Sequence, residues 1–183
     1  IKGISTKNYD SNFYFQKLFH LYFKFNYLGY IRKVSNLFDL LVEVSFMKKI
    51  LVPLDGSKYS FKALEKARMF CEKFGSELIV MTVVSDIVAL NVDYKIDIIS
   101  QNIASAEQML KQVELDFKDS NIKLTTLYKV GDITREIVEQ AEKNDVDLIV
   151  MGSRGLGVLS RTFLGSISHK VLNNTDKSVL VVK

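Results

Sequence analysis

The amino-acid sequence predicts an α/β fold, with one doubly wound, mostly parallel sheet of five strands and helices on both faces. Short, mostly apolar runs recur through residues 47–183, and such runs are typical of strands in the interior of a parallel sheet. Stretches with apolar residues at helical spacing separate these runs, and this alternation favours a parallel sheet. A chain of 183 residues that is 48% hydrophobic and 25% charged suits one such domain with an appendage.

The expected elements alternate between strand and helix four times, and a fifth strand ends the domain. Pro53 has no N–H for a ladder and therefore marks the end of the first strand. Ser57 or Ser60 is expected to cap the helix that follows, and Gly75 to stop it. The strands are expected at residues 50–54, 77–84, 122–130, 147–151 and 178–182. The helices are expected at residues 57–74, 94–118, 133–144 and 166–173.

Residues 1–46 differ in composition from the rest of the chain. They hold 12 of the 20 aromatic residues and a net charge of +3. No apolar stretch among them is long enough to span a bilayer, and they lack the pattern of a signal peptide. Three interpretations stay open: an amphipathic helix on a membrane surface, an arm that binds a partner, or a non-native or disordered segment before a natural start at Met47. We favour the third and expect the domain to comprise residues 47–183.

Charge and cysteine content narrow the function classes. Residues 47–183 carry a net charge of only +1, which gives no strong electrostatic footprint for a nucleic acid. One cysteine, Cys71, excludes an internal disulfide and favours a reducing compartment, so we expect a cytoplasmic protein. Because Cys71 lies on an apolar helical stripe, we interpret it as a small core residue and not as a reactive thiol.

The motif that points most specifically to function is a glycine-bearing stretch after the fourth strand. It runs from Gly152 through Gly155 to Gly165 and Ser166. Glycine lets backbone N–H groups approach an anion without a Cβ in the way. Gly165 and Ser166 open a helix, whose N-terminus offers free amides and a partial positive charge. Together with the Ser166 hydroxyl, these groups can hold a triphosphate without a lysine. The alternative is a glycine-rich turn that serves only the path of the chain.

Two common phosphate motifs do not fit this stretch. A Walker A loop needs Gly-Lys-Ser/Thr, which is missing, and the dinucleotide fingerprint follows the first strand of its sheet, not the fourth. Three segments instead resemble the universal stress protein family: MKKILVPLDGS at 47–57, Val130-Gly131-Asp132, and DLIVMGSRGLG…LGSIS…SVLVVK from Asp147 onward. The resemblance covers residues 47–183, and the last motif is the version found in the ATP-binding branch. It implies a Rossmann-like, adenine-nucleotide α-hydrolase-like fold and an ATP-binding stress-response protein.

The resemblance also implies which residues bind the nucleotide. Asp55 is implied to hold the ribose hydroxyls, although alone it could equally be a turn residue, and the backbone of Val83 or Val84 is implied to meet the adenine. The residues implied on the nucleoside side are Pro53, Leu54, Asp55, Val83, Val84 and Gly131. The implied phosphate contacts are Gly152, Gly155, Gly165, Ser166 and Ile167. A divalent cation, Mg²⁺ or Mn²⁺, accompanies the triphosphate in this family. The family dimerises through its last strand, which here contains Val179, Leu180, Val181 and Val182.

The sequence predicts no catalytic residues and no protein metal site. It contains no metal-ligand cluster, no nucleophile elbow and no Ser/His/Asp order. Arg154 and Arg161 lie in the glycine-bearing stretch, where either pairs with a phosphate or stays solvated. His169 is interpreted as a solvated or packing residue. We therefore expect a nucleotide-dependent, dimeric binding module. The alternative is a slow ATPase or a nucleotidyl-transferring enzyme on the same fold.

Overall fold

A computed structural model describes residues 47–86, 92–156 and 164–183. The expectations for residues 1–46 and for Arg161 lie outside these ranges. Strands and helices alternate along the described chain as predicted, with ends that differ from the predicted ones by two residues or fewer. The strands are β1 (Lys49–Pro53), β2 (Glu77–Ser85), β3 (Leu124–Gly131), β4 (Leu148–Gly152) and β5 (Ser178–Val182). The helices are α3 (Lys58–Phe74), α4 (Val92–Asp116), α5 (Ile133–Lys143) and α6 (Ser166–Asn174).

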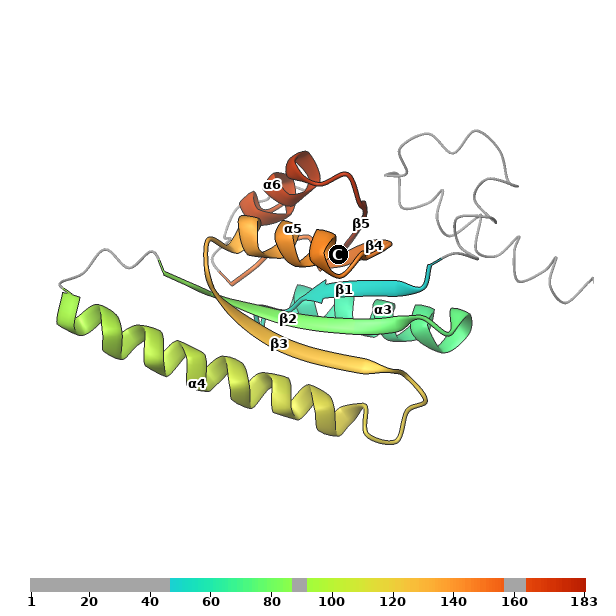
Figure 1. Ribbon diagram of the computed structural model, residues 1–183, viewed down its shortest axis with the longest axis horizontal. Coiled ribbons are helices and arrows are strands. Elements are labelled where there is room, and N and C mark those ends of the chain that lie inside the picture. Colours follow the sequence, from blue (N-terminus) through green and yellow to red (C-terminus); the bar gives the residue numbers. More distant parts are fainter. Residues whose placement is uncertain (1–46, 87–91, 157–163) are drawn as a thin grey trace, which may run out of the picture. The chain divides into compact units, whose positions relative to one another are not determined.

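The five strands form one parallel sheet in the order β3-β2-β1-β4-β5 (Figure 1). The chain moves outward from β1 through β2 to β3, and then returns to the other side of β1 for β4 and β5. The predicted fold class is confirmed. Because the direction of winding reverses at β1, a crevice is expected between the carboxyl ends of β1 and β4.

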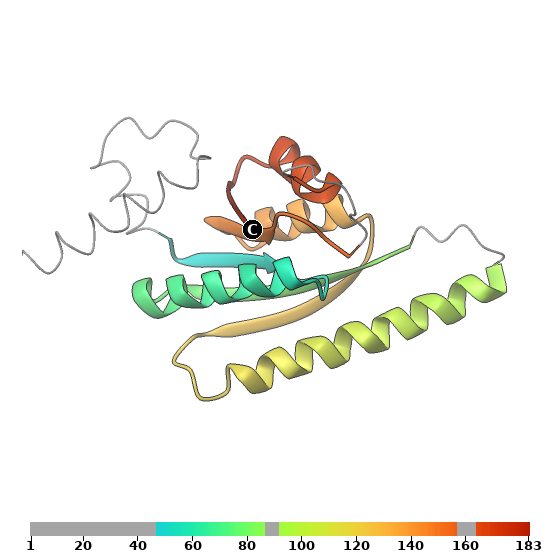
Figure 2. The same cartoon turned by 180° about the vertical axis from the view of Figure 1, so that it is seen from behind.

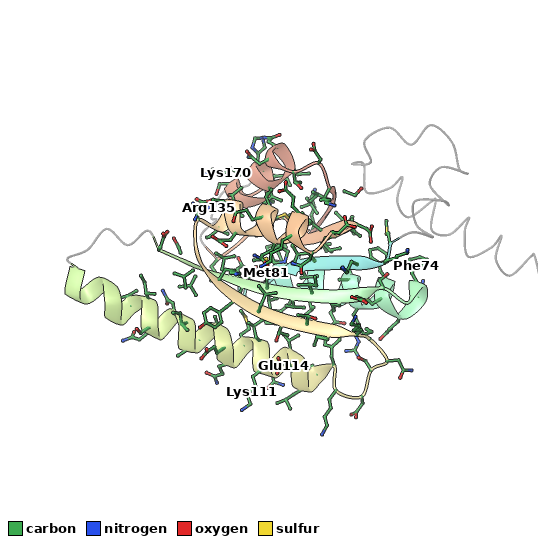
Figure 3. All side chains as sticks on the ribbon, viewed as in Figure 1. Phe74, Met81, Lys111, Glu114, Arg135 and Lys170 are labelled. Carbon is green, nitrogen blue, oxygen red and sulfur yellow. The ribbon has the colours of Figure 1, made fainter. Side chains whose placement is uncertain are left out.

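Two helices cover each face of the sheet. Successive residues of β1 point to opposite faces: Ile50 and Val52 pack with α3 and α4, whereas Leu51 packs with α5 and α6. Figure 1 shows α5 and α6 on the side opposite α4, and Figure 2 brings α3 to the front. Met81 lies in the core below α5, while Lys111 and Lys170 are exposed on the outer surfaces of α4 and α6 (Figure 3). The central strands β1, β2 and β4 are therefore buried from both sides, as their apolar runs predict, whereas the edge strands β3 and β5 are partly exposed.

Short-range hydrogen bonds set where the helices begin and end. Ser57, and not Ser60, is the N-cap of α3, and its Oγ accepts a hydrogen bond from the Ser60 N–H at 3.2 Å. Gly75 ends that helix with a left-handed φ of 70°, which glycine adopts without strain. Asp132 caps α5 in the same way, and its Oδ1 accepts from the Arg135 N–H at 2.9 Å.

The α3 helix buries the cysteine side chain in the core. Cys71 is 3% exposed and packs in the cluster between α3, α4 and the sheet, so its interpretation as a core residue is confirmed. Burial raises the pKa of the Cys71 thiol to about 12. None of the helices in the described ranges is long and apolar enough to cross a membrane.

Candidate functional site

A cavity of about 780 Å³ opens at the carboxyl ends of β1, β2 and β4, where the winding of the sheet reverses. This volume lies in the range of small-molecule sites. All predicted nucleotide-binding residues except Gly131 line it. These lining residues are Pro53, Leu54, Asp55, Val83, Val84, Gly152, Gly155, Gly165, Ser166 and Ile167. Segments up to 114 residues apart in sequence, from Pro53 to Ile167, therefore meet at one edge of the sheet. That these residues bind a nucleotide stays a prediction.

Gly131 is not among the residues that line the cavity. It is the last residue of β3 and lies opposite Ser85 in the parallel register. A Cβ at this position would lie 2.8 Å from Oε1 of Glu136 and 3.3 Å from the guanidinium of Arg135. Glycine therefore makes room here for the side chains in the first turn of α5, a local packing reason that needs no ligand.

Asp55 occupies the turn between β1 and α3 and faces the glycine-bearing stretch. Its Oδ1 accepts a hydrogen bond from the Ser57 N–H at 3.0 Å, which holds the turn. Its Oδ2 lies 2.6 Å from the place that a Cβ on Gly155 would take. The carboxylate thus rests directly against the Gly155 backbone. Asp55 can therefore hold the turn through Oδ1 while its Oδ2 faces the glycine-bearing stretch.

Different local contacts explain why glycine stands at positions 152 and 165. A Cβ on Gly152 would lie 2.8 Å from the backbone carbon of Tyr59 and 2.9 Å from the Ser60 nitrogen, so β4 ends directly against the first turn of α3. Gly165 is the N-cap of α6, and its N–H donates to the Ser153 carbonyl at 2.7 Å. Gly152 is required by the packing of the fold, whereas Gly165 fixes the start of a helix at the cavity.

The N-terminus of α6 is the part of the cavity best suited to bind an anion. Its N-cap is a glycine, so no side chain caps the amides of the first turn. Ser166 and Ile167 in this turn line the cavity, and the Ser166 side chain is exposed. Uncapped N–H groups and the positive end of the helix dipole together favour a negatively charged ligand group.

Asp55 and Arg154 are the charged residues among those that line the cavity. The Arg154 guanidinium carbon lies 5.6 Å from the centre of the Tyr59 ring, and its Nη1 is 3.5 Å from the Tyr59 hydroxyl. The Arg154 carbonyl accepts from the Ser57 hydroxyl at 3.3 Å. Arg154 is therefore not a freely solvated loop residue. It is half-buried, and its guanidinium lies against an aromatic ring at the cavity.

The lining residues within the described part of the chain include no histidine or cysteine. His169 is exposed and contacts Asn173 through its Nδ1 at 3.3 Å, which fits its interpretation as a solvated residue. In the described ranges, no three His, Cys, Asp or Glu side chains come together as a metal site. The Arg154 guanidinium and the uncapped amides at the start of α6 suit an anionic ligand.

One wall of the cavity was not predicted from the sequence. The middle of α4 contributes Asn102, Ser105, Ala106 and Met109 to it. Periodic apolar residues in this helix predicted only packing against the sheet, and Ala106 does pack in this way at 4% exposure. The available signal was that Asn102 and Ser105 stand four and one residues before Ala106, on the same helix face, and are polar.

Comparisons with known proteins agree with this architecture. The family model of the universal stress protein family matches residues 47–183. Universal stress protein MJ0531 of Methanocaldococcus jannaschii is 37% identical over 139 residues, covering 74% of this chain and 82% of its own length. Universal stress protein YxiE of Bacillus subtilis is 30% identical over 145 residues, covering 74% of this chain and 98% of its own.

Solved structures share the fold. Universal stress protein UspA from Lactobacillus plantarum matches with a TM-score of 0.71 at 22% identity, covering 75% of this chain and 98% of its own. A universal stress protein in complex with cAMP matches with a TM-score of 0.57 at 23% identity, covering 74% and 96%. One from Archaeoglobus fulgidus in complex with dAMP matches with a TM-score of 0.55 at 18% identity, covering 75% and 98%. With the family match over residues 47–183, the chain belongs to the universal stress protein family.

Proposed function

We propose that residues 47–183 bind ATP in this cavity and act as a nucleotide-dependent binding module in the stress response. The observation that carries the proposal is the uncapped N-terminus of α6, which opens into the cavity beside the glycine-bearing stretch. Two universal stress proteins of the same fold are known in complex with cAMP and with dAMP, so an adenine nucleotide fits this fold in those proteins.

The proposed pose places each part of ATP against matching chemistry. The triphosphate lies at the amides of Ser166 and Ile167, where the helix dipole favours negative charge. The ribose hydroxyls donate to Asp55, whose carboxylate would repel the phosphates if they lay beside it. The base lies over the end of β2, where Val83 lines the cavity next to Ile133 and Ile137 of α5.

The chemistry of the cavity also suits a divalent cation that arrives with the triphosphate. Mg²⁺ prefers oxygen ligands and is commonly held by one or two carboxylates together with phosphates and water. Asp55 is the one carboxylate among the described lining residues, and the proposed pose assigns it to the ribose, so the ligands of Mg²⁺ or Mn²⁺ would come from ATP and water. The cation would offset the charge of the triphosphate.

A nucleotide-binding module fits the cavity better than an ATPase or a nucleotidyl-transferring enzyme. Hydrolysis needs an oriented water and commonly a base or a stabilising cation near the γ-phosphate. Asp55 is the one carboxylate among the described lining residues, and the proposed pose assigns it to the ribose. Many turnovers per minute with magnesium and ATP would contradict the binding-module proposal and favour the enzyme.

We also propose that the protein forms a homodimer through β5. This strand pairs with β4 on one side and is an edge of the sheet in the described residues. Its half-buried Val179, Leu180 and Val181 offer apolar side chains along that edge. Sedimentation equilibrium of the purified full chain should give twice the mass of one chain, and a monomer at micromolar concentration would contradict the dimer.

The decisive experiment measures nucleotide directly. Freshly purified full-length protein is denatured, and the released small molecules are separated by chromatography; ATP or another adenine nucleotide is expected. Calorimetric titration of the nucleotide-free protein with ATP and Mg²⁺ should then show saturable binding with one site per chain. If neither experiment detects an adenine nucleotide, the glycine-bearing stretch serves only the path of the chain.

A further inference from the structure

A second hollow, of about 630 Å³, lies between the outer face of α3 and the carboxyl end of β5. Side chains of residues 58–69 of α3 line it together with Val182 and Lys183, and we call it the α3 groove. Figure 2 shows α3 on the near side of the sheet. The described residues that line the α3 groove are all different from those that line the proposed nucleotide cavity, so the two are separate features of the surface.

The α3 groove is strongly basic. Its charged lining residues are Glu65 and four lysines, Lys58, Lys62, Lys66 and Lys183, which give it a net charge of +3. The whole of residues 47–183 has a net charge of only +1. Lys62 donates a hydrogen bond from its Nζ to the Lys183 carbonyl at 3.1 Å. Neither Lys58 nor Lys66 forms a salt bridge within residues 47–86, 92–156 and 164–183.

The stability of α3 does not account for these lysines. Lys58, Lys62 and Lys66 follow one another at intervals of four residues, so they form a row on one face of the helix, where like charges repel. Lys58 is also the first residue of α3, where the positive end of the helix dipole disfavours a cation, and the first turn contains no acidic residue. Negative charge from another molecule would relieve both repulsions.

A second row of α3 side chains runs along the groove beside the lysines. It consists of Phe61, Glu65 and Met69, again at intervals of four residues. Phe61 is 42% exposed and Met69 is 39% exposed, although both side chains are large and apolar. A purely ionic ligand would leave these two side chains in water, whereas an amphipathic segment would cover them while it pairs with the lysines.

Charge narrows the choice of occupant. Residues 1–46 have a net charge of +3, and a second copy of the groove would bring the same lysines, so both would meet charge of their own sign. A flat anionic membrane would reach only the rim of a hollow. We propose that the α3 groove binds an amphipathic helix of a partner protein, with one row of acidic residues and one row of apolar residues. This inference goes beyond the proposed function and does not depend on ATP binding.

Fluorescence anisotropy with the full-length protein and labelled synthetic helices tests the proposal. The first peptide, of about 20 residues, has a row of glutamates beside a row of leucines. The second has lysines in place of the glutamates, and the third has alanines in place of the leucines. The first should bind saturably, with an affinity that falls as salt is added. The second and third should bind at least about 10-fold more weakly.

Charge reversal on α3 locates the binding surface. Lys58→Glu combined with Lys66→Glu should lower the affinity for the first peptide at least about 10-fold, because two attractions become repulsions. The control combines Lys111→Glu with Lys170→Glu, which changes the net charge by the same amount on the exposed surfaces of α4 and α6 (Figure 3) and should keep the affinity. Equal losses in the two double variants would overturn the proposal.

Phe61→Ala tests the apolar row and should lower the affinity about 10-fold. Leu115→Ala is the control, since that side chain is 56% exposed on α4 and lies outside the groove lining, and it should keep the affinity. Thermal unfolding verifies that each variant is folded, and Met69→Ala replaces Phe61→Ala if that variant is unfolded. Unchanged affinity in the folded variant would show that the peptide binds by charge alone and would overturn the groove.

Two further results would assign the groove to another occupant and overturn the proposal. One is binding to phosphatidylserine vesicles that Lys58→Glu with Lys66→Glu abolishes, while the first peptide binds no better than the second. The other is a dimer in sedimentation equilibrium that Phe61→Ala converts to a monomer while peptide binding stays the same, which would place a second copy in the groove.

Discussion

At the residue scale, the sharpest contact of the site joins Gly155 to Asp55. A side chain at Gly155 would meet the Asp55 carboxylate before it met any ligand, because the nearest heavy atom to its Cβ is Oδ2 at 2.6 Å. The sequence suggests that glycine here lets a phosphate approach the backbone. The structure adds a second requirement, which is room for the carboxylate that the proposed pose assigns to the ribose.

Gly155→Val should abolish ATP binding while the domain stays folded. Gly155 is exposed, so the extra side chain removes no core packing, but it displaces the Asp55 carboxylate and blocks the backbone. Calorimetric titration measures binding, and circular dichroism with thermal unfolding measures folding. Asp55→Ala as a single change should weaken binding. When it is combined with Gly155→Val, it should restore no binding, because the valine still blocks the backbone. Wild-type affinity in Gly155→Val would show that no ligand group approaches there.

Arg154→Ala should weaken ATP more than AMP. Arg154 is the cationic residue among the described lining residues, and the Tyr59 ring holds its guanidinium. A charged hydrogen bond to the distal phosphates contributes about 1.5–3 kcal/mol, so we expect ATP affinity to fall about 10- to 100-fold. Arg135→Ala is the matched control, since that side chain is 60% exposed and lies outside the cavity lining. An equal loss for ATP and AMP would argue against a contact with the phosphate tail.

At the element scale, Ser57 joins the stability of α3 to the shape of the site. Its Oγ accepts from the Ser60 N–H as the helix cap, and its hydroxyl donates to the Arg154 carbonyl. Ser57→Ala should lower the free energy of unfolding by about 1 kcal/mol, the usual cost of a lost cap. Urea denaturation measures this, with the exposed Ser100→Ala of α4 as the control, expected within about 0.5 kcal/mol of wild type. Equal stability of the two variants would contradict the capping role.

The elements themselves were predictable because their signals are local. Mostly apolar runs predicted β1, β2, β4 and β5, and Gly75 predicted the end of α3 through its backbone conformation. The α4 wall was not predictable by the same reasoning. One turn of a helix can pack against a sheet while the next lines a cavity, and a 3.6-residue period is identical in both cases. Only the three-dimensional course of α4 past the end of β2 separates Ala106 from Asn102.

Part of the cavity lining was predictable from the sequence, but the contacts that explain each glycine were not. Ten of the eleven residues that glycine spacing and the family resemblance indicated line the cavity. These signals could not show that Gly152 packs on the Tyr59 backbone or that Gly131 accommodates Glu136, because both contacts join segments remote from the motif or depend on a side-chain rotamer. The glycine motif thus combines a glycine that faces the Asp55 carboxylate at the cavity, Gly155, with one that leaves room for the α3 backbone, Gly152.

At the scale of the whole molecule, the buried thiol of Cys71 reports on unfolding. With a pKa raised to about 12, only about one thiol in ten thousand is ionised at pH 8 in the folded chain. Alkylation by iodoacetamide should therefore be slow in the native protein and fast in denaturant. If ATP binds only the folded state, about 100-fold excess over its dissociation constant should slow labelling by about 100-fold. Rapid labelling of the native protein would contradict the burial of Cys71, and labelling unaffected by ATP would argue against linkage.

The central place of β1 in the sheet has a consequence for how the chain is made. During synthesis β1, β2 and β3 emerge first and can pair, but β1 keeps an unpaired edge until β4 appears at Leu148. Such an edge is a site for wrong pairing with another chain. The lining residues Gly152, Gly155 and Ser166 emerge at nearly the same time as the strand that covers this edge. A ligand that needs these residues would therefore bind only chains in which β4 is present to cover that edge of β1.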